Sequence, residues 1–227
     1  MLKAIIFDCD GVIVDSEPYH MRAFQSVLAE EGITLTREAY YQQYLAMDDK
    51  GCFEAVLHAD HRPTDKDSVK RLILRKKALY QALSQEKCPL YPGVVDFVRK
   101  AQGHYRMAIA SGAFRAEIKA ALDGGGIREA FPVIVSAQDV RNGKPHPEAY
   151  LTALQQINQR HPPPPILPSE CLVIEDSLHG VSAARAAGMR CLAVTNSYSR
   201  EMLDGRADRI VESLVGLEPT SLETLCP

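Results

Sequence analysis

Short runs of apolar residues alternate with helical patterns along most of the chain. Runs that are apolar throughout, rather than at every second position, are typical of parallel strands buried on both faces of a sheet. The expected strands are residues 3–7, 106–110, 133–135, 171–174, 190–194 and 209–211, and the expected helices between them include residues 94–101, 116–122, 148–157 and 180–187. This alternation predicts an α/β fold with a doubly wound, mostly parallel sheet.

Residues 16–88 interrupt the alternation with one helical pattern after another. An apolar helical side begins near His20, and Gly32 offers a place for that helix to end. Pro89 marks the return to the alternating pattern. We therefore expect two domains, a core of residues 1–15 and 90–227 and an inserted all-helical domain of residues 16–89.

The composition is that of an ordinary globular protein. Hydrophobic residues make up 46% and charged residues 24% of the 227 residues, which excludes disordered, collagen-like and coiled-coil chains. The formal net charge of -3 provides no basic field for holding a nucleic acid, so we expect no nucleic-acid partner.

Membrane and secretory signals are not expected either. The sequence has no stretch of ~20 apolar residues, which a membrane-spanning helix needs, and its first residues become acidic too soon for a signal peptide. The six cysteines are scattered without a Cys-x-x-Cys pair, so we expect free thiols in a reducing compartment. These features predict a cytoplasmic protein and leave its oligomeric state open, a monomer being compatible with them.

Chemically active residues follow several of the predicted strands. In open α/β sheets, ligands bind at the carboxyl ends of the strands, so residues that follow different strands meet there. Asp8, Asp10 and Gly11 follow the first strand, Ser111 and Gly112 the second, Lys144 lies in a Gly-Lys-Pro loop after the third, and Glu175 and Asp176 follow the fourth.

Four carboxylates at one edge of a sheet repel one another unless a cation lies among them. A hard divalent cation with oxygen ligands relieves this repulsion, and Mg²⁺ also keeps positions for water and a phosphate. A lysine, a hydroxyl and the backbone N–H groups near Gly112 and Ala113 fit a phosphoryl dianion. The pattern therefore predicts a magnesium site that binds a small phosphorylated metabolite.

Asp8 and Asp10 point into one pocket only if the chain turns at once, which Gly11 permits. One carboxylate can then attack phosphorus, while the other protonates the leaving oxygen and later activates water. Taken alone, an Asp-Gly pair is also a common turn, and Lys144 is compatible with a surface lysine.

The four segments together resemble the motifs of the haloacid dehalogenase-like superfamily. The first is Asp8-Cys-Asp10-Gly11 followed by Asp15-Ser-Glu-Pro, and the others are Ser111, Gly143-Lys144-Pro145 and Glu175-Asp176-Ser177, in the family's order and spacing over almost the whole chain. The helical insert is similar to the small helical cap of the β-phosphoglucomutase-like phosphatase subfamily. The resemblance thus implies a Rossmann-like core with an inserted cap.

The resemblance also implies a role for each matched residue. Asp8 would be the nucleophile and a magnesium ligand, and Asp10 the general acid and base, with its backbone carbonyl as a second ligand. Asp176 would bind magnesium, with Glu175 beside it or behind it. The phosphoryl group would be held by Ser111, Lys144 and the N–H groups at Gly112 and Ala113. The aspartate at position 10 is typical of the family's phosphatases and phosphomutases.

Phosphatase activity is the favoured expectation, with a phosphomutase of the β-phosphoglucomutase type as the alternative. The mutases carry a Lys-Gly-x-x-Arg type segment in the cap. Here Lys50-Gly51 lies several residues late, and Glu54 occupies the position of the arginine. Asp48 and Asp49 would repel a second phosphate unless they face away. A binding protein on a retained scaffold is a third hypothesis, although Asp8, Lys144 and Asp176 are all present.

Several residues keep two interpretations. His20 is either a buried histidine or a cap residue that assists Asp10 or the substrate, as the related mutases have a histidine there. Arg115 either contacts substrate or lies on the surface. The basic run 75–77 is either a solvated face, as is usual, or supplies a side chain that reaches an anionic substrate. The proline run 162–165 is either a stiff exposed loop or a ligand for a partner.

Overall fold

The computed structural model describes residues 1–45, 47, 49–83 and 89–226. The chain divides into two compact units, which we call the first unit, Met1–Asp15 with Lys87–Pro227, and the second unit, Ser16–Glu86.

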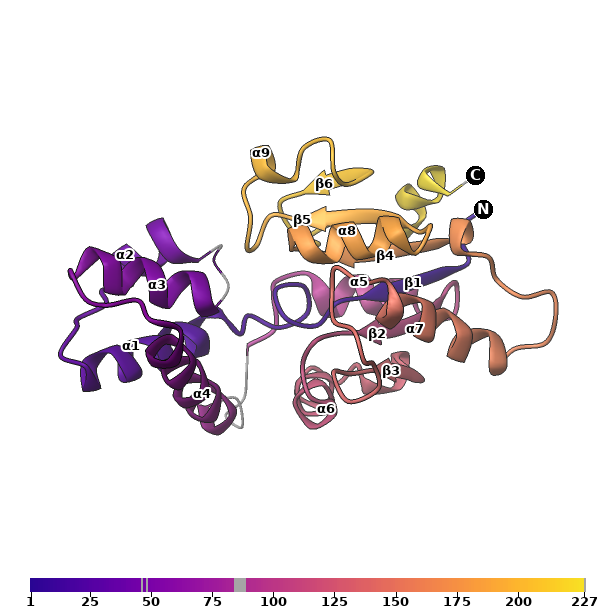
Figure 1. Ribbon diagram of the computed structural model, residues 1–227. Helices are drawn as coiled ribbons and strands as arrows, with labels where there is room; N and C mark the ends of the chain where they lie inside the picture. Colours follow the sequence, from indigo (N-terminus) through magenta and orange to yellow (C-terminus); the bar gives the residue numbers. More distant parts are fainter. Residues whose placement is uncertain (46, 48, 84–88, 227) are drawn as a thin grey trace. The chain divides into compact units, whose positions relative to one another are not determined.

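The first unit is built on a six-stranded sheet in the order β3-β2-β1-β4-β5-β6, in which every pair of neighbours is parallel (Figure 1). The strands are β1 (Ala4–Phe7), β2 (Arg106–Ala110), β3 (Val133–Val135), β4 (Cys171–Glu175), β5 (Arg190–Val194) and β6 (Arg209–Val211). In this register Phe7 lies beside Ile109 of β2 and Ile174 of β4, so the residues that follow β1, β2 and β4 emerge at one edge. The predicted doubly wound parallel sheet is confirmed.

Helices cover both faces of this sheet because successive residues of each buried strand point to opposite faces. Ile5 and Phe7 pack in a cluster with side chains of α5 (Val94–Ala101) and α6 (Arg115–Gly124). Ala4 and Ile6 pack in a second cluster with α7 (Glu148–Gln159) and α8 (Leu178–Ala186). The remaining elements are the short helix α9 (Arg200–Leu203) and the 3-10 turns Arg128–Ala130, Pro168–Glu170 and Pro219–Leu225.

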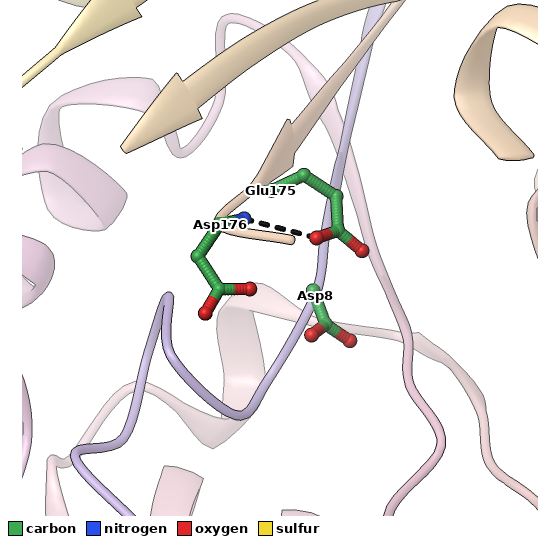
Figure 2. Close-up of side chains that lie close together, drawn as sticks. All are labelled: Asp8, Glu175 and Asp176. Carbon is green, nitrogen blue, oxygen red and sulfur yellow. Dashed lines mark hydrogen bonds between the residues drawn. The ribbon is translucent and has the colours of Figure 1, made fainter. Parts of the chain in front are cut away.

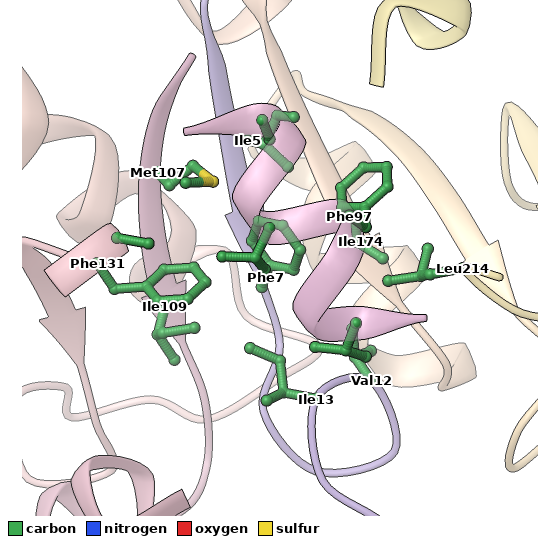
Figure 3. Close-up of a cluster of buried hydrophobic side chains, with 14 of the residues drawn as sticks. Ile5, Phe7, Val12, Ile13, Phe97, Met107, Ile109, Phe131, Ile174 and Leu214 are labelled. Carbon is green, nitrogen blue, oxygen red and sulfur yellow. The ribbon is translucent and has the colours of Figure 1, made fainter. Parts of the chain in front are cut away.

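Phe7, the last residue of β1, packs within the first of these clusters (Figure 3). Its ring meets those of Phe97 and Phe131 edge to face, with centroid distances of 6.0 and 5.3 Å. Because such pairs add about 0.5–1.5 kcal/mol beyond their area burial, they fix the end of β1 in the core. The position of the backbone at the end of β1 is therefore fixed by packing, and the residues that follow Phe7 start from this fixed position.

The described residues of the second unit form helices joined by short loops, with no strand among them. The helical elements are α1 (Glu17–Glu30), α2 (Arg37–Ala39), the π turn Tyr40–Tyr44, α3 (Asp49–Ala59) and α4 (Lys66–Leu83). Side chains of α1, α3 and α4, among them Phe24, Phe53 and Leu72, form a core of their own. Gly32 has a φ of +76° just after α1, as expected for the residue that ends a helix.

The division between the units falls between residues 86 and 87, whereas the sequence pattern placed it between 89 and 90. Two contacts account for the difference. The Asp15 N–H donates to the Pro89 carbonyl at 2.9 Å, and Val14 forms an antiparallel bridge with Leu90. The segment that returns from the insert is therefore tied to the segment that leaves the core.

Two other sequence features have a simple structural outcome. Cys9, Cys52, Cys171, Cys191 and Cys226 are free, buried thiols, while Cys88 lies outside the described residues. The proline run 162–165 is an exposed loop between α7 and β4. Within the described part of the chain, no helix combines the length and the apolar character that crossing a bilayer would require.

Candidate active site

Three carboxylates meet at the carboxyl edge of the sheet (Figure 2). Asp8 follows β1 directly, Glu175 is the last residue of β4, and Asp176 comes next. Each offers one oxygen atom within 4.8 Å of the other two, and all three residues are buried. Lys144 lies among them, with its Nζ 2.8 Å from Asp8 Oδ1 and 2.5 Å from Glu175 Oε1. The predicted convergence of these four residues is confirmed.

Glu175 is held by hydrogen bonds on both of its oxygen atoms. Oε1 accepts from Lys144 Nζ at 2.5 Å and from the Tyr150 hydroxyl at 2.7 Å. Oε2 accepts from the Asp176 N–H and from the N–H and hydroxyl of Ser177, at 2.9 to 3.0 Å. Five donors use the roughly four lone-pair positions of a carboxylate. Glu175 is therefore arranged to orient Lys144 and the turn after β4.

The charge on Lys144 keeps Glu175 ionised. Burial by itself raises the pKa of Glu175, but the Lys144 ammonium and the donated hydrogen bonds outweigh burial and leave the pKa below its usual value. Burial likewise opposes the charge of Lys144, whereas Asp8 and Glu175 raise its pKa above the usual range. The pair is a buried, charge-assisted contact.

Asp8 and Asp176 are in the opposite situation. Burial raises the pKa of Asp8 to about 7, with Lys144 opposing and the charges of Glu175 and Asp10 adding to the rise. Burial, Glu175 and Asp8 raise the pKa of Asp176 well above its usual value. Burial and the neighbouring carboxylates thus favour the protonated form of both groups when no cation neutralises them.

This donor set fits a hard divalent cation. All its groups are oxygen atoms, and Asp8 Oδ1 is buried with the Lys144 ammonium beside it but without a hydrogen bond. A divalent cation that replaces the protons of Asp8 and Asp176 would remove the cost of burying two like charges. The residues present therefore fit Mg²⁺.

Two glycines make room for these carboxylates. A Cβ atom at Gly11 would overlap the Asp176 carboxylate, and Gly11 also has a φ of +74°, so the tight turn directly after Asp10 requires glycine. A Cβ atom at Gly180, in α8, would overlap the Glu175 carboxylate.

Replacing Gly180 by Ala tests how closely Glu175 is positioned. In a helix this change ordinarily stabilises a protein by about 1 kcal/mol. Here we expect destabilisation by about 1–3 kcal/mol and a loss of activity of about tenfold or more, because Glu175 and Lys144 must shift. The melting temperature and kcat of the variant check this.

Ser182→Ala is the matched control, since Ser182 is exposed on the same helix. A Gly180→Ala variant that behaves like this control would show that the position of Glu175 is not critical.

The predicted phosphate-binding residues follow β2 at the same edge. Ser111 is buried, its N–H donates to the Val135 carbonyl at 3.0 Å, and its hydroxyl accepts from the Ala113 N–H at 3.1 Å. A Cβ atom at Gly112 would meet nothing within 4 Å, so the backbone there is open. Asp10 is near enough for its charge to raise the pKa of Asp8. The phosphate-binding role of this loop stays a prediction.

Arg115 has a partner on the neighbouring loop. Its Nη2 lies 2.6 Å from Asp139 Oδ2, and its N–H donates to Gln138 at 3.2 Å. Asp139 also accepts from the N–H and hydroxyl of Ser136. Arg115 therefore connects the loop after β2 to the loop after β3, and a contact with substrate stays a prediction.

A second group of polar residues lies inside the second unit around Lys76. Lys76 is only 2% exposed, and its Nζ lies 2.7 Å from His20 Nδ1 and 2.6 Å from Asp49 Oδ1. The ammonium also lies over the rings of Phe24 and Tyr80, at 4.6 and 5.5 Å from their centroids. A solvated face is therefore the wrong interpretation for Lys76, because the apolar side of α4 and the Asp49 carboxylate both favour its burial.

The neighbours of Lys76 behave as the sequence suggested. Arg75 pairs with Glu30 and, at 2.9 Å, with Glu31, and Lys77 is exposed. Asp49 forms its ion pair with Lys76, so its charge is compensated, while Asp48 lies outside the described residues. The expected repulsion of a second phosphate therefore has no support from Asp49.

His20 is neutral in this arrangement. Burial and the Lys76 charge lower its pKa from 6.5 to about 3, since the ring accepts a hydrogen bond from the ammonium. The ring is also stacked on Tyr80 with a centroid distance of 4.0 Å. His20 is thus satisfied within its unit, and its proposed assistance to Asp10 stays a prediction.

This lowered pKa predicts a pH dependence of stability. Below pH about 6.5, His20 binds a proton in the unfolded chain but not in the folded protein. The stabilisation of the folded state by neutral His20 is therefore fully present above that pH and is lost progressively as the pH decreases toward 3. Between pH 7 and pH 5 we expect a loss of about 1–2 kcal/mol in wild type relative to His20→Gln, whose amide can still accept from Lys76. Urea unfolding of both proteins measures the difference, and parallel curves for the two would contradict it.

A family model described as haloacid dehalogenase-like hydrolase matches residues 2–188, most of the chain. The chain belongs to the haloacid dehalogenase-like hydrolases. The matched segment contains every residue of the carboxylate and lysine cluster.

Relatives of this haloacid dehalogenase-like hydrolase include named phosphatases. Fructose-1-phosphate phosphatase YqaB of Escherichia coli is 30% identical over 193 residues, which are 84% of this chain and 95% of that protein. The phosphorylated carbohydrates phosphatase of Thermotoga maritima is 29% identical over 211 residues, 91% of this chain and 89% of that protein. A crystal structure of CbbY from Rhodobacter sphaeroides in complex with xylulose-(1,5)bisphosphate matches with a TM-score of 0.71 and 28% identity, covering 96% of each chain.

Sequence reasoning missed three residues of this hydrolase site. Tyr150 donates to Glu175, the Ser197 hydroxyl donates to Asp176 Oδ2, and Asn196 Nδ2 donates to the Gly11 carbonyl at 2.7 Å. Ser197 and Asn196 follow β5, so inspection of the carboxyl end of that strand would have found them. Tyr150 carried no such signal, because it lies on the apolar side of a helix.

Proposed function

We propose that this chain is a Mg²⁺-dependent phosphatase that hydrolyses a small phosphorylated metabolite, with phosphorylated sugars as the preferred class. The buried cluster of Asp8, Asp176, Glu175 and Lys144 at the carboxyl edge of the sheet carries this proposal. The sugar-phosphate phosphatases among its relatives support the substrate class. Its cytoplasmic location and the absence of a nucleic-acid partner stay predictions from the sequence.

Asp8, the Asp10 carbonyl and Asp176 would hold the Mg²⁺ ion. When bound, the ion neutralises the aspartates and the phosphoryl oxygens, so that an anionic nucleophile can approach an anionic substrate. We assign Glu175 to a supporting position, because its two oxygens already accept five hydrogen bonds. Its partner Lys144 would hold a phosphoryl oxygen together with Ser111 and the N–H groups of Gly112 and Ala113.

Two displacements at phosphorus complete the reaction. In the first, an Asp8 carboxylate oxygen bonds to phosphorus, the ester P–O bond breaks, and the Asp10 carboxyl gives its proton to the leaving oxygen. In the second, the Asp10 carboxylate takes a proton from water, whose oxygen bonds to phosphorus and displaces Asp8. Inorganic phosphate and the alcohol are the products, and both aspartates return to their starting forms.

The second unit would act as the cap that selects the substrate. The phosphatase assignment over a mutase rests on the phosphatase relatives and on Glu54, which pairs with Lys50 at 3.6 Å where the mutase pattern has an arginine.

Phosphate release from a panel of phosphorylated metabolites, with Mg²⁺ and with EDTA, tests the proposal. The panel includes fructose 1-phosphate and β-glucose 1-phosphate, the latter also scored for glucose 6-phosphate after priming with a bisphosphate. We expect metal-dependent phosphate release from at least one sugar phosphate. Isomerisation with little free phosphate would instead establish the mutase, and inactivity throughout would favour a binding protein.

A further inference from the structure

A pocket of about 410 Å³ lies at the opposite edge of the same sheet, in the first unit. Its walls come from the segments that precede strands: Ser169 before β4, Arg190 at the start of β5, and Asp208 before β6. In a parallel sheet these amino ends form the edge opposite the carboxyl ends, where Asp8 and Asp176 lie. The pocket is therefore separate from the candidate active site.

The pocket is strongly positive for a protein with a net charge of -3. Arg185, Arg190 and Arg206 line it, and Asp208 is the one acidic residue among the lining side chains. The charges of these four lining residues sum to about +2, because arginine is always protonated. A concave surface with more arginine than carboxylate side chains attracts anions.

Each of the three guanidinium groups has a contact with a neighbouring oxygen atom. Arg190 Nη1 pairs with Asp208 Oδ1 at 2.8 Å, Arg185 Nη1 donates to the Arg206 carbonyl at 3.3 Å, and Arg206 Nε donates to the Met202 carbonyl at 3.1 Å. A guanidinium has five N–H donors in a planar fork. These contacts therefore orient the groups and leave most of their donors for another acceptor.

Several residues that line the pocket have small side chains or none. Gly188, Gly205 and Ala207 line it, and a Cβ atom at Gly205 would meet nothing within 4 Å. The volume lies in the range of small-molecule sites, roughly 300–1,000 Å³. The pocket thus combines room for a small molecule with guanidinium groups that can donate hydrogen bonds to it.

We propose that this pocket binds a small polyanion that carries its charge on phosphate groups. Arginine forks match phosphate oxygens two at a time, which single-point ammonium groups do not. Two negative groups on one molecule would balance the excess charge of the pocket. The proposal is independent of the reaction at the opposite edge, because no residue is shared between the two sites.

Binding of pyrophosphate, measured by isothermal titration in EDTA, tests the proposal. We expect Arg185→Gln and Arg206→Gln each to weaken the affinity by about tenfold, since each removes a charge-assisted contact. Arg99→Gln is the matched control, because Arg99 is exposed on α5 and does not line the pocket. This control should bind pyrophosphate as wild type does.

A second variant keeps every arginine in place. Ser169 is exposed at the rim, so Ser169→Glu adds a negative charge with little risk to folding, and Ser169→Gln is its neutral counterpart. We expect only the glutamate variant to weaken binding. No pyrophosphate binding to wild type, or equal binding by wild type, Arg185→Gln and Ser169→Glu, would overturn the proposal.

Discussion

Replacing Asp8 by Asn is expected to reduce phosphate release by a factor of about 10⁴ or more while the protein remains folded. The amide has the same shape as the carboxylate but does not attack phosphorus, and it is a poor ligand for Mg²⁺. Burial raises the pKa of Asp8 to about 7, so ionisation of this carboxyl group does not favour the folded state. We therefore expect a melting temperature close to that of wild type.

Asp123→Asn is a suitable control, because Asp123 is exposed near the end of α6. The comparison requires kcat with Mg²⁺ on the best substrate of the panel and a thermal melt for each protein. Turnover of the Asp8→Asn variant within tenfold of wild type would remove Asp8 from the mechanism.

Lys144→Met is expected to destabilise the protein by about 3 kcal/mol near pH 8 and to abolish activity. Methionine retains most of the apolar stem, but it removes the ammonium group that lies between Asp8 and Glu175 and over the Tyr150 ring. Glu175 is fully buried, so its carboxylate would lose its compensating charge. Removing one partner of a buried ion pair leaves the other charge buried without compensation, and this causes the loss of stability.

The pH dependence of this loss has a definite sign. The Lys144 charge is the largest effect that opposes burial, so we expect the folded-state pKa of Glu175 to rise when Lys144 is replaced. A carboxyl group with a raised folded-state pKa favours the folded state as pH falls, because the folded protein then binds the additional proton. The deficit relative to wild type should therefore be largest at neutral and alkaline pH and should shrink toward pH 5.

The double variant Lys144→Met/Glu175→Gln separates stability from activity. It removes both charges, so we expect it to recover most of the lost stability and none of the activity. Urea unfolding at pH 8 and pH 5 gives the full comparison. A double variant no more stable than the single one would show that the ion pair is not the origin of the effect.

The sheet was predictable because its strands are apolar throughout, and burial on both faces leaves that signature in the sequence. β4 ends one residue later than expected, at Glu175. A charged residue is not expected in a buried strand, but the hydrogen bonds from Lys144 and Tyr150 compensate for the burial of Glu175. The site was predictable to the same extent, since the carboxyl ends of parallel strands share one edge.

The remaining features depend on contacts between residues far apart in the sequence. Lys76 is buried by Asp49 and by rings from other turns, which the basic run 75–77 does not reveal. The supporting position of Glu175 follows from donors on three separate segments. Neither follows from periodicity, because both are set by tertiary packing.

The most direct test of the account is to locate the phosphoryl group during turnover. Wild type and Asp10→Ala would be mixed with a ³²P-labelled substrate and Mg²⁺, quenched in acid, digested and mapped. The account predicts label on the peptide that contains Asp8, with more label in Asp10→Ala because water is no longer activated. Turnover without protein-bound label in either enzyme, or label on a different peptide, would contradict the assignment of Asp8 as the nucleophile.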